Sequence, residues 1–197
     1  MSHILVFDFD GTMVDSMEHL ATIAVRLLNS YFGLSLEMGK YLYFKTSGLP
    51  FEEQVELMFP NHEKNVELVA SFEQEKEDTI FKQPLFPEVK SVFAALSAGG
   101  HRLVISSSNT RSMMEEYCSR TGLKVDLILG YRKGFGKGEA HFNYIKEYFK
   151  CEADQVIFIG DSPKDYQKAV DSGVNFIART GTFTADELKK GGAKHVI

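Results

Sequence analysis

The sequence alternates short, nearly uninterrupted apolar runs with longer stretches of helical periodicity, and this alternation constrains the fold more than any other feature. A strand that is buried on both faces shows such a run, and residues 156–159 (VIFI) are the clearest case. Strands that alternate with helices form a parallel sheet with crossover helices on both faces. We therefore predict an α/β fold with a Rossmann-like parallel sheet, whose strands lie within residues 4–9, 103–105, 125–129, 156–159 and 174–178.

Helix boundary signals fall between these runs. Pro87 suits the first turn of one helix, and Gly99 with Gly100 suits its end. Residues 184–187 (TADE) have the pattern of a capping box. They predict a last short helix.

The first two apolar runs are much farther apart than a crossover requires. About 90 residues separate them, whereas a crossover needs roughly 10 to 12. Residues 16–83 carry several helical patterns and no convincing strand. We predict that they form a small all-α domain, inserted into an α/β core made of residues 1–15 and 84–197. A domain of this size is too small to be relied on to fold alone.

Composition excludes several classes of function. The chain has 22 Lys and Arg against 27 Asp and Glu, a net charge of -5, so it lacks the basic field that nucleic acids and anionic membranes attract. Cys118 and Cys151 are too few for a disulfide framework or a zinc cluster and suit a reducing cytoplasm. Asp8 and Asp10 interrupt the first apolar run, and no run approaches the roughly 18 residues of a membrane span. We expect a cytoplasmic protein, a monomer or homodimer, without nucleic-acid or membrane partners.

Two aspartates follow the first predicted strand, in residues 8–12 (DFDGT). Residues two apart on a strand point the same way, so Asp8 and Asp10 begin on one face, at the sheet edge where ligands of open α/β folds bind. Two like charges there repel each other unless a cation or a shared proton compensates. A turn in which Asp10-Gly11 merely ends the strand would also explain this segment.

A second pair of acids after another strand favours a ligand site. In residues 156–165 (VIFIGDSPKD), Ser162 can cap a helix that begins at Pro163, and Asp165 can complete a capping box. This accounts for Asp165 and leaves Asp161 unexplained. Four acids at two strand ends, without Cys or His at ligand spacing, form an oxygen-donor site that favours Mg2+ over zinc. The predicted metal-site residues are Asp8, Asp10, Asp161 and Asp165.

Anion-binding groups are expected beside such a site, because Mg2+ held by carboxylates commonly holds phosphate as well. A third predicted strand ends in residues 106–109 (SSSN), whose hydroxyls and amides can cradle an anion, although such runs also cap helices for structural reasons. Lys137 can reach a phosphate from the glycine-rich segment 134–138, and Lys133 is a rival for this role. The candidate phosphate ligands are Ser106, Ser107, Asn109 and Lys137.

Together these segments resemble the four motifs of the haloacid dehalogenase-like hydrolase superfamily. Residues 8–12, Ser106, Lys137 and residues 160–165 (GDSPKD) follow one another in the order and approximate spacing of that family. The first and fourth motifs are specific to the family, whereas the second and third are informative only in combination with them. The resemblance covers the whole chain, because the predicted insertion is similar to the helical cap of the phosphoglycolate phosphatase and β-phosphoglucomutase type.

The resemblance implies the roles of the catalytic residues. Asp8 would attack phosphorus and form an aspartyl-phosphate, and Asp10 would act as the general acid and base. Ser106 and Lys137 would hold the phosphoryl group, and Lys137 would also counter the charge of Asp8. The implied activity is that of a phosphatase, a hydrolase of phosphoric monoesters, acting on a small phosphorylated metabolite such as phosphoglycolate or a sugar phosphate.

The resemblance also implies the cofactor. Mg2+ would be bound by Asp8, by the backbone carbonyl of Asp10 and by Asp161. Asp165 would be a further ligand through water, or would orient the others. Dehalogenases of this family work without the second acid of the first motif and without the metal, so Asp10 favours phosphoryl transfer.

The cap is expected to supply specificity. Residues 46–51 (TSGLPF) are a turn-rich break that is either a substrate-facing loop or an ordinary connection between helices. Sugar-phosphate mutases and phosphonate hydrolases of this cap type carry a basic residue where this chain has Pro50-Phe51, so the loop is more similar to that of the phosphoglycolate phosphatases. The candidate substrate contacts in the cap are Lys45, Gly48 and Phe51.

Two other functions stay open. The first is a phosphomutase of the β-phosphoglucomutase type, although these mutases place a histidine where this chain has Leu20, with His19 one position away. The second is a phosphate-sensing or partner-binding module with little turnover, which would have no need for both Asp8 and Asp10. The 6 histidines are scattered without ligand spacing, and we assign them no role.

Overall fold

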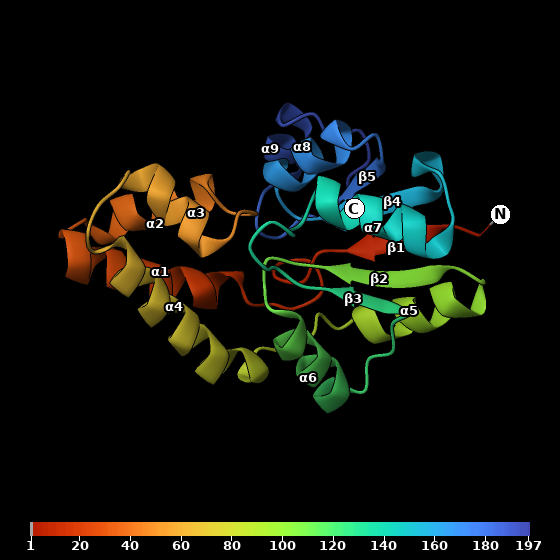
Figure 1. The fold of residues 1–197 in the computed structure, drawn as a ribbon, viewed down its shortest axis with the longest axis horizontal. Coiled ribbons are helices and arrows are strands. Elements are labelled where there is room, and N and C mark those ends of the chain that lie inside the picture. The colour runs from red at the N-terminus through yellow and green to blue at the C-terminus, as the bar shows by residue number, and fades with distance from the viewer. Residues whose placement is uncertain (1) are drawn as a thin grey trace. The chain divides into compact units, whose positions relative to one another are not determined.

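The computed structural model describes residues 2–197, and the chain forms two compact units (Figure 1). The α/β unit contains the chain up to Asp15 together with Leu85–Ile197. The helical unit contains Ser16–Pro84.

The α/β unit is built on a five-stranded parallel sheet with the strand order β3-β2-β1-β4-β5. In the centre of the sheet, Phe7 lies opposite Ile105 on one side and Ile159 on the other. The predicted fold class is confirmed, and the predicted strand ends are correct to within two residues. The strands are β1 (Ile4–Phe7), β2 (Arg102–Ser106), β3 (Leu127–Leu129), β4 (Val156–Gly160) and β5 (Asn175–Ala178).

The first strand ends earlier than predicted. The carbonyl of Phe9 accepts hydrogen bonds from the N–H groups of Met13 and Val14, at 2.9 and 3.0 Å. These bonds turn the chain back, so the regular strand ends at Phe7, and only the N–H of Asp8 still bonds to β4. Asp8 therefore stands at the point where the backbone begins to turn.

Helices cover both faces of the sheet (Figure 1). On one face, Phe142 of α7 and Ala169 of α8 pack in the same apolar cluster as Val6. On the other face, the ring of Phe93 in α5 lies 4.5 Å from that of Phe7, measured between centroids. The helices of this unit are α5 (Val89–Ala98), α6 (Arg111–Thr121), α7 (Glu139–Phe149), α8 (Pro163–Asp171) and α9 (Ala185–Lys190), with a 3-10 turn at Ala153–Gln155.

Two of the predicted helix starts are confirmed and one is displaced. Helix α8 begins at Pro163 behind a Ser162 capping box, and α9 follows a capping box of Thr184. Helix α5 begins at Val89 rather than near Pro87. The N–H of Val89 donates to the carbonyl of Phe86, so the residues between them form a separate turn.

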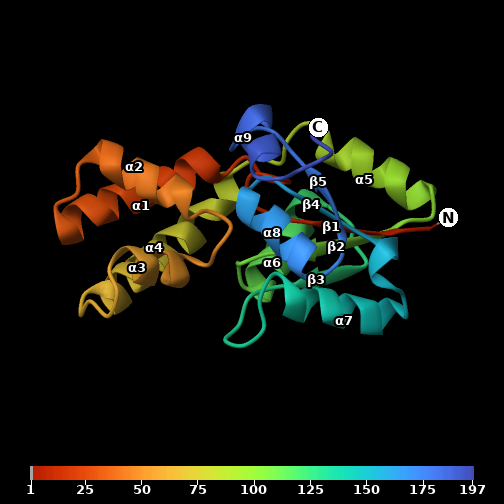
Figure 2. The same cartoon turned by 90° about the horizontal axis from the view of Figure 1, so that it is seen from above.

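The helical unit consists of helices and loops. Figure 2 shows its four α-helices. Their apolar side chains, among them Leu28, Tyr43, Val55 and Phe72, form the core of the unit. No strand occurs between Ser16 and Pro84, as the sequence predicted. The helices are α1 (Met17–Phe32), α2 (Leu36–Lys45), α3 (Phe51–Met58) and α4 (Asn65–Thr79), followed by a 3-10 turn at Ile80–Lys82. Among residues 2–197, no helix has both the length and the apolar character that crossing a membrane requires.

Candidate active site

The carboxyl ends of β1 and β4 lie next to each other, and each is followed by an aspartate. The chain continues from β1 toward β2 on one side and from β4 toward β5 on the other, so the sheet has its switch point between these two strands. Ligands of open α/β sheets bind at such a point. The N–H of Asp8 donates to the carbonyl of Ile159 at 2.9 Å, which holds the two strand ends together.

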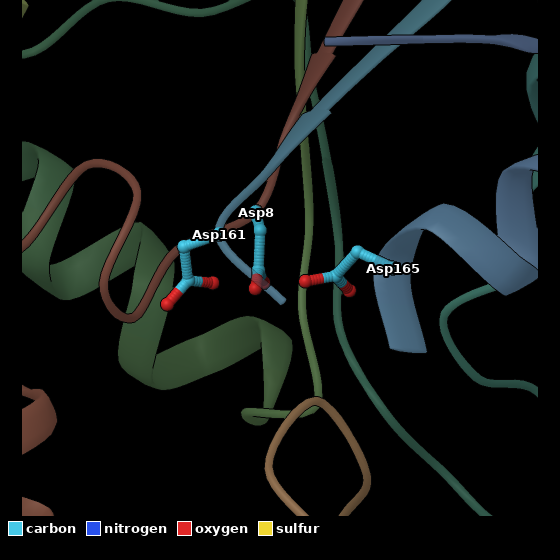
Figure 3. A group of neighbouring side chains, drawn as sticks. All are labelled: Asp8, Asp161 and Asp165. Atoms are coloured by element: carbon cyan, nitrogen blue, oxygen red, sulfur yellow. The ribbon is translucent and has the colours of Figure 1, made fainter. Parts of the chain in front are cut away.

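Three carboxylates meet at this edge. Asp8 follows β1, Asp161 follows β4, and Asp165 comes from the first turn of α8 (Figure 3). Each contributes an oxygen to a group whose members lie within 4.8 Å of one another. All three side chains are buried. Of the four acids predicted to form a site at the two strand ends, the structure groups these three, and the carboxylate of Asp10 is not among them.

Lys137 lies inside the cluster. Its Nζ is 2.8 Å from Oδ2 of Asp8 and 2.7 Å from Oδ1 of Asp165. Lys133, the rival for this position, is exposed. One ammonium group among three buried carboxylates leaves an excess of negative charge, which is unfavourable unless a proton or a cation balances it.

The pKa values in the cluster reflect this excess. Burial raises the pKa of Asp8 to about 7; Lys137 opposes the shift and Asp165 adds to it. Burial, together with the charges of Asp8 and Asp165, also raises the pKa of Asp161. Burial alone would lower the pKa of Lys137, but the carboxylates of Asp165 and Asp8 outweigh burial and raise it. The site therefore holds an ammonium ion and attracts further positive charge.

Asp161 is held in place by two hydroxyls and by a close approach of the backbone. Thr182 donates to its Oδ2, and Thr12 lies 3.5 Å from its Oδ1. Gly11 has a φ of 71°, and a Cβ at this position would collide with the carboxylate of Asp161. Glycine is therefore required in the turn after β1.

The two carboxylate oxygens of Asp165 make different contacts. Its Oδ2 accepts from the hydroxyl and the backbone N–H of Ser162, at 2.6 and 3.3 Å, in the predicted capping box. Its Oδ1 faces Lys137. The capping interaction thus fixes the rotamer that brings the other oxygen into the cluster.

The Asp10 carboxylate lies outside the carboxylate cluster. Its Oδ2 accepts from Nδ2 of Asn109 at 2.6 Å. Asn109 belongs to the predicted anion cradle, and its own N–H donates to the hydroxyl of Ser107 at 3.1 Å. The two loops that follow β1 and β2 are therefore joined by side chains.

Ser106 is the last residue of β2 and is fully buried. Its Oγ lies 2.8 Å from Nδ1 of His141, a residue of α7 to which the sequence gave no role. Burial lowers the pKa of His141 to about 4, a backbone hydrogen bond with Gly130 opposes the shift, and the positive charge of Lys137 adds to it. The imidazole is therefore neutral at physiological pH.

The three candidate residues of the helical unit differ in their surroundings. Phe51 is 4% exposed, and its ring stacks on that of Phe72 with centroids 3.8 Å apart. Its side chain thus packs in the core of the unit, contrary to the substrate contact that its place in the turn-rich break suggested. Gly48 has a φ of 89°, and Lys45 is exposed, with Nζ 5.5 Å from the centroid of the Tyr41 ring.

Sequence reasoning missed three residues that support the site. His141 contacts Ser106, Thr182 contacts Asp161, and Arg179 donates to the carbonyl of Gly11 at 3.2 Å. Arg179 also bonds to Glu88 at 2.9 Å and lies over the ring of Phe86. None of them belongs to a local pattern, because each is brought to the site by tertiary packing alone.

Comparison with known proteins identifies the family. The family model of the haloacid dehalogenase-like hydrolases matches residues 5–179. The chain belongs to this family. The match extends from β1 past the carboxylate cluster, so it includes Asp8, Lys137, Asp161 and Asp165.

Solved structures resemble this hydrolase over nearly its full length. A predicted phosphatase from Clostridium acetobutylicum is 22% identical and has a TM-score of 0.84, with 100% of this chain and 94% of that chain covered. A haloacid dehalogenase-like family hydrolase from Streptococcus pneumoniae is 20% identical, with a TM-score of 0.82 and coverage of 99% and 93%. A predicted phosphoglycolate phosphatase from Haemophilus somnus is 19% identical, with a TM-score of 0.77 and coverage of 99% and 93%. At these identities the likeness shows the fold, and no curated protein sequence matches the chain.

Proposed function

We propose that this hydrolase is a Mg2+-dependent phosphatase that cleaves a small phosphorylated metabolite through an aspartyl-phosphate on Asp8. The α/β unit is the catalytic core and the helical unit is the cap. The observation that carries the proposal is the contact of Lys137 with both Asp8 and Asp165 beside Asp161. A buried nucleophile, a cation and further carboxylates are what phosphoryl transfer requires for positioning and charge neutralisation.

The donor set fits Mg2+. It consists of oxygen atoms only, from Asp8, Asp161 and Asp165, with the backbone carbonyl of Asp10 as the further ligand that we infer. The negative charge that Lys137 leaves unbalanced, seen in the raised pKa values of Asp8 and Asp161, is what a divalent cation would offset. When bound, Mg2+ would neutralise charge on the phosphoryl oxygens and on Asp8.

The chain's own groups perform the transfer. Asp8 attacks phosphorus in line with the leaving oxygen. Lys137 stays protonated, because its pKa is raised, and offsets charge on the phosphoryl group and on Asp8. Ser106, Ser107 and the amides of their loop donate to the phosphoryl oxygens. Ser107 accepts from the N–H of Asn109, so its own hydroxyl proton can still be donated.

Asp10 is the general acid and base in this proposal. It protonates the leaving oxygen during attack by Asp8 and later takes a proton from the water that hydrolyses the aspartyl-phosphate. Its carboxylate is held by Asn109, apart from the metal-binding carboxylates, and is therefore available for proton transfer. Asn109 thus acts on the mechanism by orienting Asp10.

The substrate class is a small phosphate monoester, phosphoglycolate-like or a sugar phosphate, processed in the cytoplasm. We associate substrate choice with two features of the cap. One is the turn that contains Gly48, and the other is the exposed side chain of Lys45. A mutase role is less well supported, because His19 bonds through Nε2 to the hydroxyl of Thr79 at 2.7 Å, within the helical unit. The predicted phosphoglycolate phosphatase from Haemophilus somnus shares the fold and makes this substrate the first one to test.

The test measures release of inorganic phosphate from a small aryl phosphate, with Mg2+ and after chelation. Asp8→Asn should abolish release while leaving the melting temperature close to that of the wild type. Asp154→Asn, the same change at an exposed position, is the matched control and should retain full activity. Turnover by Asp8→Asn above a tenth of the wild-type rate, or full activity after chelation, would exclude the proposed mechanism.

A further inference from the structure

His141 is a buried polar residue beside the site that the proposed mechanism does not yet use. It lies in the first turn of α7, shortly after Lys137 in the chain. None of its surface is exposed, and its ring packs against Phe135 with centroids 4.6 Å apart. Its Nδ1 lies 2.8 Å from Oγ of Ser106, and the backbone of Gly130 also bonds to the ring.

The surroundings of the ring indicate which nitrogen carries the proton. A neutral imidazole has one donor nitrogen and one acceptor nitrogen. Nε2 is buried and has no hydrogen-bond partner within residues 2–197. A buried N–H group without an acceptor is rarer and less favourable than a buried acceptor without a donor. With no partner at Nε2, the contacts with Ser106 and with the Gly130 backbone both fall to Nδ1. The proton therefore belongs on Nδ1, where the oxygen of Ser106 can accept it.

We propose that His141 is a positioning residue that donates through Nδ1–H to Ser106 Oγ and so leaves the Ser106 hydroxyl proton for an oxygen of the bound phosphoryl group. The inference rests on the proposed function, because it takes Ser106 as a phosphoryl ligand. A serine hydroxyl has a single proton to donate. With the opposite tautomer of His141, that proton would be donated to the ring and lost to the substrate.

The same hydrogen bond has a second effect on the site. Ser106 ends β2, and His141 lies in the helix that follows Lys137. The bond therefore ties together the two segments that carry phosphoryl-binding groups. Positioning of this kind matters because small displacements of charge-stabilising donors reduce the rate strongly.

A direct test reads the tautomer without any substitution at the site. Long-range 1H–15N correlation spectra of the 15N-histidine-labelled, Mg2+-loaded protein report which ring nitrogen of each histidine carries the proton. The signals of His141 are identified by their loss in His141→Asn. We expect a neutral ring protonated at Nδ1, and a proton on Nε2 would overturn the inference.

Kinetics separate positioning from space filling. His141→Asn keeps an N–H donor near the place of Nδ1, whereas His141→Leu is of similar size and has none. We expect His141→Leu to lower kcat/KM for an aryl phosphate about tenfold and His141→Asn to restore most of it. In a Ser106→Ala background, His141→Leu should change kcat/KM less than about twofold. Two results would show that His141 only fills space. One is an equal loss of kcat/KM in His141→Asn and His141→Leu. The other is a tenfold loss from His141→Leu even in the Ser106→Ala background.

The two proposals fail in different ways. Failure of the proposed function appears as turnover by Asp8→Asn. The present inference fails if Nε2 carries the proton, or if His141→Asn does not restore the kcat/KM that His141→Leu loses, in a protein whose Asp8→Asn variant is inactive. The exposed His195 provides the control for the substitution chemistry, because His195→Leu should leave kcat/KM unchanged.

Discussion

The two units of this hydrolase differ in net charge and in how deeply their charged side chains are buried. The helical unit contains 11 Asp and Glu against 6 Lys and Arg, whereas the α/β unit contains 16 of each. The net charge of the chain, -5, is therefore that of the helical unit. The balanced α/β unit nevertheless holds the strongest electrostatic conflict, because it buries Asp8, Asp161, Asp165 and Lys137 together.

The difference shows that net charge says little about where chemistry occurs. Two ion pairs of the helical unit, Lys40 with Glu18 and Arg26 with Glu75, lie at the surface, where water screens them, whereas Lys76 is buried beside a half-exposed Glu73. In the α/β unit the same kinds of groups are desolvated, so their pKa values move and their interactions strengthen. Burial, rather than number, marks the reactive charges.

Removing the central cation should have the largest effect. Lys137→Met leaves the buried carboxylates of Asp8 and Asp165 without their ammonium, and we expect a loss of about 3–5 kcal/mol in the free energy of unfolding. Activity toward an aryl phosphate should fall about a thousandfold. Urea unfolding and phosphate release measure the two effects.

The matched substitution in the helical unit is Lys40→Met, at a side chain that is 53% exposed and paired with Glu18. It should change the free energy of unfolding by less than about 1 kcal/mol. Similar losses in the two variants would contradict the distinction between buried and exposed charge.

Removing the metal should have the next largest effect. Mg2+ at 100 times its dissociation constant should raise the free energy of unfolding by about 2.7 kcal/mol, because it binds the folded carboxylate cluster and not the unfolded chain. Thermal melting with and without chelator measures this shift. Asp161→Asn should remove most of the shift and Asp154→Asn should not; an unchanged shift in Asp161→Asn would place the metal elsewhere.

Much of the fold could be predicted from the sequence, because local patterns encode it. Uninterrupted apolar runs predicted the strands, and the long gap after the first run predicted an all-helical segment. The acids after β1 and β4 were expected to meet, because the carboxyl ends of parallel strands share one edge of a sheet. The structure brings Asp8, Asp161 and Asp165 together there.

What the sequence missed depends on tertiary packing. Thr182 and His141 carry no signal of their own, since a lone threonine or histidine has many ordinary explanations. Phe51 follows a turn-rich segment and so suggested a substrate contact, but it is the first residue of α3 and faces the apolar core. Periodicity around a short break between helices does not distinguish these two environments.

The pH dependence of stability should reveal His141 as a buried neutral group of the α/β unit. Its pKa is about 4 in the folded protein and about 6.5 in an unfolded chain, so the unfolded state binds the proton first as the pH falls. Stability from the neutral ring is complete above about pH 6.5 and is lost toward pH 4, with a slope of at most about 1.4 kcal/mol per pH unit.

Comparison of variants isolates this contribution from that of other groups. Asp8 acts in the opposite direction in the metal-free protein, because its folded pKa is raised. The difference in unfolding free energy between the wild type and His141→Asn, followed from pH 7.5 to 4.5 with urea, removes the terms that the two proteins share. A difference that stays constant across this range would contradict burial of a neutral imidazole, and His195→Asn serves as the exposed control.

The smallest effect is expected at the surface of the helical unit, where Arg26 forms an ion pair with Glu75. The two side chains are 55% and 41% exposed, so water and salt screen their attraction. Arg26→Gln and Glu75→Gln should each change the free energy of unfolding by less than about 0.5 kcal/mol, and the double variant should show a coupling of similar size that disappears in 1 M salt. A coupling above about 2 kcal/mol would mean that the helical unit relies on its surface charges. In that case its excess of acids would be a structural feature, and the contrast with the α/β unit would not be one between buried and exposed charge.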